Sequence, residues 1–247
     1  MIKLENVNKT FDDFHALKDF SMNVNKGSIY GLVGVNGAGK TTVIKHLAGI
    51  YKHDMGNILL DGENVYDNEK VKSRMGYVSD DLYFFPQYNL KMLAKFYRNM
   101  YKNWNADRFY ELIALMGLDL KRRVGRFSKG MQKQSALALA LSTMPEVLLL
   151  DEPIDGLDPI VRSRIFKWII EDVADRQMTV LISSHNLKEM DGICDTVGII
   201  KDGKMLLESD LDELKTKMSE SGDFEHSPPT LDEIFIHLYE KDVTANV

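Results

Sequence analysis

The chain has 247 residues, of which 44% are apolar and 28% charged, a composition typical of a soluble globular protein with a sizeable core. Its net charge of −6 argues against nucleic acid as a partner, because a phosphate backbone requires a basic surface. The single cysteine, Cys194, excludes a framework of disulfides and favours a reducing cytosol. The N-terminal residues lack the apolar segment of a signal peptide, and no apolar run approaches the ~20 residues of a membrane-spanning helix. We therefore expect another chain to make any membrane crossing.

The N-terminal third of the chain predicts short strands. Alternating or continuous apolar residues place them at 2–7, 15–24, 28–33, 57–60 and 75–78. Asp61-Gly62 is a hairpin turn signal, and the strand at 28–33 leads directly into a glycine-rich segment.

Helical spacing replaces the strand patterns from about residue 84 to residue 143. Leu90, Leu93 and Tyr97 repeat at this spacing, and Gly117 suits the C-terminal end of a second helix. These helices predict a helical subdomain inserted into an α/β core. The core then resumes with strands at 147–150, 179–183, 196–200 and 204–207, and with a helix at 161–175. Asp202-Gly203 is the turn signal between the last two strands.

The C-terminal residues predict a linker and a last helix. Residues 218–229 contain Ser, Gly and a Pro-Pro pair, which is typical of a linker or loop. Thr230 and Glu233 form a capping box, and Leu231 and Ile234 begin an amphipathic pattern. We expect this helix to dock on the core of its own chain rather than on a partner.

The strongest functional signal is the segment from Gly34 to Thr42, which fits the phosphate-binding pattern G-x-x-x-x-G-K-[ST]. A β-prone segment precedes it and a helical pattern follows, as the motif requires. Glycines let successive backbone N–H groups turn toward a polyphosphate, and the helix N-terminus adds partial positive charge. We expect Lys40 to bind the β/γ-phosphates of ATP and Thr41 to ligate Mg²⁺. The other expected nucleotide-binding residues are Asn36, Gly37, Ala38, Gly39 and Thr42.

A second signal is the acidic pair Asp151 and Glu152, which follows the apolar strand at 147–150. Ligands of open α/β folds bind at the carboxyl ends of their strands, where this pair would lie. We expect Asp151 to hold Mg²⁺ directly or through water, and Glu152 to polarise the attacking water.

Two weaker signals take their value from their position relative to the stronger motifs. Ser128 opens an Ala-rich helix, where an N-cap hydroxyl beside Gly130 would suit an anion. Since one nucleotide does not need two such sites, we expect this one to face the nucleotide of a second copy. His185 follows the strand at 179–183, where an imidazole could contact the γ-phosphate and orient water.

The order of these motifs resembles that of ATP-binding cassette (ABC) ATPases over nearly the whole chain. The resemblance implies a RecA-like parallel sheet with an N-terminal antiparallel β region and the inserted helical subdomain. It divides the chain into an ATPase domain at 1–217, with helices at about 84–143, and a C-terminal linker and helix at 218–247. It also implies a head-to-tail dimer, in which Ser128, Lys129 and Gly130 form the signature segment. Phe11 falls where the family stacks an aromatic ring on adenine, with a place in the core as the less favoured alternative.

Four positions, in three segments, depart from the family pattern. Lys129 and Met131 replace a Gly and the Gln of the signature Leu-Ser-Gly-Gly-Gln. Asp80 stands where Gln is common, and we expect it to reach Mg²⁺ through water and to alter the metal dependence. Ile154 replaces a common Thr, with no consequence that we can derive.

The resemblance implies the ATPase subunit of a membrane transporter, peripheral on the cytoplasmic face, working as a homodimer with integral membrane permease subunits. The C-terminal helix resembles that of bacterial exporters of peptides or antibiotics, with a closer likeness to the YtrB-like group. Aromatic residues after Asp80 suit a groove for a helix of the permease, or the subdomain's own core. Two alternatives stay open: a soluble ABC ATPase of repair or translation, and a nucleotide-gated switch with little turnover.

Overall fold

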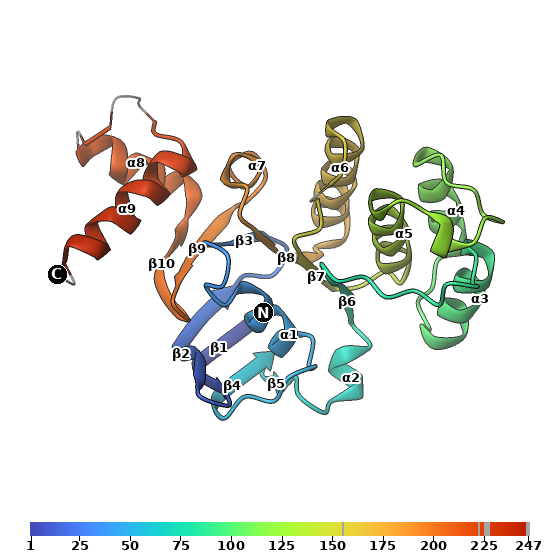
Figure 1. The fold of residues 1–247 in the computed structure, drawn as a ribbon, viewed down its shortest axis with the longest axis horizontal. Helices are drawn as coiled ribbons and strands as arrows, with labels where there is room; N and C mark the ends of the chain where they lie inside the picture. Colours follow the sequence, from blue (N-terminus) through green and yellow to red (C-terminus); the bar gives the residue numbers. More distant parts are fainter. Residues whose placement is uncertain (155, 222, 225–227, 246–247) are drawn as a thin grey trace.

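The computed structural model describes residues 1–154, 156–221, 223–224 and 228–245. The described chain forms two β-sheets with helices around them (Figure 1). The first half contains β1 (Ile2–Phe11), β2 (Phe14–Val24), β3 (Ile29–Val33), α1 (Lys40–Leu47), β4 (Met55–Leu60), β5 (Glu63–Asn64), α2 (Glu69–Lys72), β6 (Met75–Val78), α3 (Leu90–Met100) and α4 (Ala106–Leu115). The second half contains η1 (Val124–Arg126), α5 (Lys129–Ser142), β7 (Val147–Asp151), α6 (Pro159–Arg176), β8 (Thr179–Ser184), α7 (Leu187–Asp191), β9 (Thr196–Lys201), β10 (Lys204–Asp210), α8 (Leu211–Ser221) and α9 (Leu231–Ala245).

The larger sheet has six strands in the order β10-β9-β3-β8-β7-β6. All neighbouring pairs are parallel except β9 and β10, which form a hairpin. The smaller sheet has the order β2-β1-β4-β5 and is antiparallel. This arrangement confirms the predicted α/β class, with a parallel sheet and an N-terminal antiparallel region. The predicted turns at Asp61-Gly62 and Asp202-Gly203 are also present, with positive φ at all four residues.

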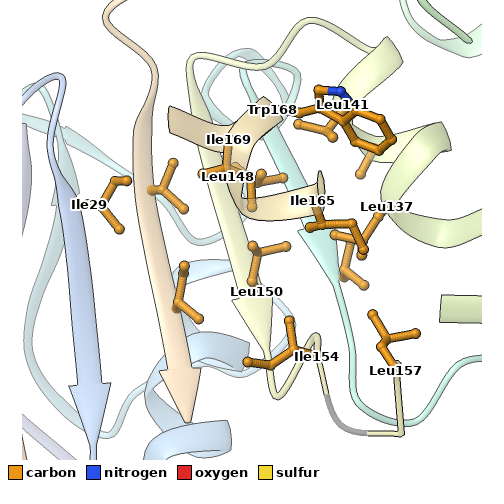
Figure 2. Close-up of a cluster of buried hydrophobic side chains, with 14 of the residues drawn as sticks. Ile29, Leu137, Leu141, Leu148, Leu150, Ile154, Leu157, Ile165, Trp168 and Ile169 are labelled. Atoms are coloured by element: carbon orange, nitrogen blue, oxygen red, sulfur yellow. The ribbon is translucent and has the colours of Figure 1, made fainter. Parts of the chain in front are cut away.

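Strand β7 shows why its sequence is apolar throughout. Leu148 and Leu150 join the core on one face of the larger sheet, with residues of α5 and α6 (Figure 2). Val147 and Leu149 join the core on the opposite face, with residues of α1 and the smaller sheet. Successive side chains of a strand point to opposite faces, and both faces of this strand are covered.

The chain leaves the larger sheet after β6 and returns at β7, and α3, α4, η1 and α5 lie between these two strands. Since β6 and β7 are neighbours in the sheet, the helices form an excursion at its edge (Figure 1). Phe109, Leu112 and Leu137 pack these helices together in the same core as β7. The domain boundaries stay a prediction, but the helices between β6 and β7, from Leu90 to Ser142, lie within the predicted range of 84–143.

In the C-terminal region, the start of the predicted linker is wrong, because residues 218–221 belong to a helix. Helix α8 runs to Ser221, into the predicted linker at 218–229, because Leu211, Leu214 and Met218 extend an apolar face that packs on the core. Residues 222 and 225–227 of that predicted linker lie outside the described residues. Within the described chain, no helix combines the length and the apolar character needed to cross a bilayer.

The predicted capping box of α9 is confirmed. Thr230 Oγ1 accepts from Glu233 N at 3.3 Å, and the Glu233 carboxylate accepts from Thr230 N at 2.8 Å. Leu231 and Ile234 are fully buried in the chain's own core, as expected for a helix that docks internally.

Candidate functional site

The glycine-rich loop joins β3 to α1, as its motif predicts. Gly37 and Gly39 have φ of 81° and 115°, a region that favours glycine. A Cβ at Gly39 would also lie 3.3 Å from the carbonyl oxygen of Ala16. Gly39 is the N-cap of α1, so the loop ends at the unpaired N–H groups of a helix N-terminus. This geometry suits a phosphate group.

Lys40 supplies the positive charge of the loop. Its side chain is only 6% exposed, and Nζ donates to the carbonyl oxygens of Gly34 at 2.8 Å and Val35 at 3.3 Å. Nζ also lies 3.4 Å from Oε1 of Glu152. The ammonium is therefore held between the loop and the acidic pair.

Asp151 is fully buried at the end of β7. Its Oδ1 accepts from the Ser183 hydroxyl at 2.7 Å and from the Thr41 hydroxyl at 3.1 Å. Its Oδ2 is buried and has no hydrogen-bond partner among the described residues. An orphaned anionic oxygen beside a hydroxyl fits a hard cation such as Mg²⁺. The described residues offer no group of three or more acidic, His or Cys side chains placed to hold a metal ion. A cation here would thus take its remaining ligands from water and phosphate.

Glu152 leaves the strand direction, since its φ is 46°, in the left-handed region. Its N–H donates to Ser183 Oγ at 3.1 Å, and its carbonyl accepts from Lys133 Nζ at 2.8 Å. Its carboxylate lies 3.0 Å from Nδ1 of His185 as well as near Lys40. A strained backbone held by several contacts is typical of functional sites.

These groups surround one cavity of about 360 Å³. The lining residues are Phe14, Ala16, Asn36, Gly37, Gly39, Lys40, Thr41, Thr42, Asp80 and Glu152. Asp151 joins them through its bond to Thr41, and His185 through its bond to Glu152. Ala38 is buried within the loop. Most of the predicted site residues therefore lie together. Burial, together with the charge of Asp151, raises the pKa of the nearby Tyr77 phenol.

Four predicted residues are neither in the cavity lining nor joined to it in the way that Ala38, Asp151 and His185 are. Phe11 packs edge-on against Tyr51, with 5.1 Å between ring centroids, whereas Phe14 is 65% exposed and lines the cavity. The role of Phe11 in stacking on adenine stays a prediction. Ser128 caps α5 by accepting from Met131 N at 3.2 Å. The other two residues outside the cavity, Lys129 and Gly130, belong to the first turn of that helix.

Sequence reasoning missed four residues of the site, namely Phe14 and Ala16 in the cavity lining and Ser183 and Lys133 beside Glu152. Phe14 lies after a turn whose geometry the sequence does not specify. Ser183 pairs with Asp151 in the parallel register of β7 and β8, and a polar residue ending a buried strand could have indicated it. Lys133 is 8% exposed in the middle of α5, and a lysine within an Ala-rich buried helix was the available signal.

The chain is similar to known proteins over most of its length. The model of the family described as "ABC transporter" matches residues 17–155. The ABC transporter ATP-binding protein YtrB of Bacillus subtilis is 34% identical over 87% of this chain and 74% of its own length. The bacitracin transport ATP-binding protein BcrA of Bacillus licheniformis is 37% identical over 88% of this chain and 72% of its own length.

Solved structures share the fold. An ATP-binding subunit of an ABC transporter superposes with a TM-score of 0.86, at 23% identity, over 97% of this chain and 99% of its own. A dimeric ATP-binding cassette with ADP and phosphate superposes with a TM-score of 0.76, at 22% identity, over 85% of this chain and 99% of its own. Together with the family match and the two relatives, these likenesses identify the chain as a member of the ABC transporter family, as one of its ATP-binding subunits.

Proposed function

We propose that this chain hydrolyses ATP in the cavity between α1 and β7 and that this turnover drives a membrane permease. The observation that carries the proposal is the placement of the Glu152 carboxylate. It reaches the cavity beside Lys40 and within 3.0 Å of His185, while the adjacent Asp151 keeps an unpaired oxygen. Because the two neighbouring acids have different surroundings, they suit different tasks: Asp151 suits binding of a metal ion, and Glu152 suits orientation of a water molecule.

The binding step follows from the loop. Its backbone N–H groups and Lys40 would hold the β- and γ-phosphates. Thr41 and Asp151 would hold Mg²⁺, with Asp80 acting through water at the cavity wall. When bound, the metal supplies neutralisation of the charge that develops on the phosphates. Phe14 and Phe11 are the two aromatic candidates for contact with the base.

The chemical step assigns a role to each remaining side chain. Glu152 would accept a hydrogen bond from the attacking water and orient it toward the γ-phosphate. His185, bonded to Glu152 through Nδ1, would keep that carboxylate oriented and offer its other nitrogen toward the phosphate. Lys40 would stabilise negative charge on the transferred group.

The signature residues would act on a second copy. Ser128, Lys129 and Gly130 lie outside the cavity of their own chain, although the helix N-terminus that they form suits an anion. A head-to-tail homodimer would bring each set to the nucleotide of the other chain. The structural relative solved as a dimer with ADP and phosphate supports this arrangement by analogy of fold.

The permease would be a separate integral membrane chain, and this subunit would bind it at the cytoplasmic face. Several relatives carry names that point to export of peptides or antibiotics, namely bacitracin transport, linearmycin resistance and lantibiotic transport proteins. We propose an exported cargo of this class. The acidic net charge gives no support to a nucleic-acid partner.

The test is Glu152→Gln in the full chain, with Glu171→Gln as a matched control on the surface of α6. We expect the first variant to lose about 10²–10⁴-fold in kcat, the usual contribution of a general base, while it still binds ATP. Light scattering should show it as a dimer with ATP and Mg²⁺ and as a monomer without them. Turnover equal to that of the Glu171→Gln control would contradict the role of Glu152. A nucleotide-bound monomer would contradict the shared site.

A further inference from the structure

Lys133 connects three parts of the molecule that are distant in sequence. It lies on α5, five residues after Ser128, and it is 8% exposed. Its Nζ donates to Oδ1 of Asp80 at 3.0 Å and to the carbonyl oxygen of Glu152 at 2.8 Å. Asp80 follows β6, and Glu152 follows β7. One ammonium group therefore joins the helix that begins at Ser128 to the cavity wall and to the proposed general base.

The bond to the Glu152 carbonyl acts on a strained residue. A non-glycine residue with φ of 46° is unfavourable unless its surroundings hold it. Ser183 holds the peptide on the N-terminal side of Glu152, because Glu152 N donates to its Oγ and its carbonyl oxygen. Lys133 holds the peptide on the C-terminal side. The two contacts together fix the conformation that carries the Glu152 carboxylate into the cavity.

The bond to Asp80 balances a charge. The Asp80 side chain is 54% exposed and lines the same cavity as Glu152 and Lys40. Two carboxylates at one cavity repel each other, and a cation close to them offsets this repulsion. Lys133 is the cation that contacts Asp80, just as Lys40 is the cation that contacts Glu152. Because Asp80 stands where Gln is common in the family, Lys133 faces a charge here that a Gln would not carry.

We propose that Lys133 is a positioning residue for ATP hydrolysis. It holds the backbone of Glu152 in its left-handed conformation, and it makes that conformation depend on the placement of α5. Because Ser128 and Lys133 belong to one helix, a shift of α5 away from β7 would break the bond to Glu152. Contact of Ser128 with the second nucleotide would thus be coupled to the readiness of the base on the same chain. The inference rests on the proposed role of Glu152.

The test compares Lys133→Met with Lys72→Met. Lys72 is a matched control because it also donates to a backbone carbonyl, that of Gly49 at 3.1 Å, far from the acidic pair. Loss of one charge-assisted hydrogen bond corresponds to a fall in kcat of roughly 10- to 100-fold for Lys133→Met. We expect KM for ATP, and the ATP affinity measured in EDTA, to stay within about threefold of the parent, because Lys133 contacts neither the loop nor Thr41. The Lys72→Met variant should match the parent in all three quantities.

Three further variants and one measurement separate positioning from simple folding. Lys133→Arg retains a cationic donor and should recover most of the lost kcat. Lys133→Met/Asp80→Asn is compared with Asp80→Asn alone, because both variants lack the Asp80 carboxylate. A lower kcat in the double variant than in Asp80→Asn then belongs to the bond with the Glu152 carbonyl. Without nucleotide, hydrogen exchange in a peptide covering 147–154 should be faster in Lys133→Met than in Lys72→Met.

The outcomes are distinct. Parent-like kcat in Lys133→Met, or equal kcat in Lys133→Met/Asp80→Asn and Asp80→Asn, overturns the proposal that Lys133 positions Glu152. If either result appears while Glu152→Gln stays inactive, the proposed function survives and only the role of Lys133 fails. If Glu152→Gln is active, the proposed function fails first. If Lys133→Met does not fold, the double variant and Lys133→Arg still decide the question.

Discussion

Replacing Ser183 with Ala should weaken both the fold and the site. The Ser183 hydroxyl is fully buried, donates to Asp151 Oδ1 at 2.7 Å and accepts from Glu152 N at 3.1 Å. A hydrogen bond to a charged group contributes about 1.5–3 kcal/mol and a neutral one about 1 kcal/mol. Glu152 N keeps its 3.3 Å bond to the Ser183 carbonyl, so the second loss is partial. We expect Ser183→Ala to lower the free energy of unfolding by about 2–4 kcal/mol.

Urea unfolding of the full chain measures this loss. With an m-value of about 3 kcal/mol/M, the midpoint should fall by about 1 M. Ser142→Ala is the control, because the Ser142 hydroxyl is equally buried but bonds only to the Ala138 carbonyl within α5. That variant should fall by only about 0.3 M, the equivalent of one neutral bond. Equal shifts in the two variants would show that the bond to Asp151 adds nothing, and the account of how the acidic pair is held would be wrong.

Three other predictions concern single side chains. Asp80→Gln should keep ATPase activity but shift its Mg²⁺ titration, and a titration that matches the parent would remove the assigned link to the metal. Burial lowers the pKa of His46, so the unfolded chain takes up this proton at a higher pH than the folded chain, and the free energy of unfolding should fall as the pH drops below about 6.5. The urea midpoints measured at pH 7.5 and pH 5.5 should therefore differ less in His46→Gln than in the parent. An equal difference in the two proteins would refute this prediction. Burial raises the pKa of the Cys194 thiol, which packs against Gly31 and Met190. A thiol reagent should therefore label native protein at least about tenfold more slowly than protein in urea, and equal rates would contradict the packing.

The fold could be predicted largely from local patterns, for a physical reason. A strand covered on both faces must be apolar at every position, so β7 was recognisable from Val147–Leu150 alone. Turns that need positive φ require particular residues, so Asp61-Gly62 and Asp202-Gly203 marked two hairpins. The end of α8 was not predictable in this way, because Ser221 lies among polar residues and the helix depends on tertiary packing of Leu211 and Leu214.

The site was predictable only where the residues of one continuous segment determine its geometry. The phosphate loop needs glycine at particular φ values, so its pattern is visible in the sequence. The backbone of Glu152 is different, because no local pattern predicts a left-handed glutamate after a strand. That conformation depends on Ser183 and Lys133, which lie on β8 and α5. Sequence reasoning placed the acids at the correct edge of the sheet but could not show what fixes them.

The acidic pair illustrates how two adjacent residues acquire different chemistry. Asp151 is still part of β7, so its side chain is buried and its Oδ1 is bonded by hydroxyls, which suits a fixed metal ligand. Glu152 has left the strand, so its carboxylate contacts Lys40 and His185, two groups that belong to other elements. A contact network of this kind cannot shift as a unit when only one element moves. Displacement of α5 alone would therefore disturb Glu152 and leave Asp151 in place. A cassette with α5 displaced would still bind its metal and nucleotide but would not hydrolyse ATP until α5 returned.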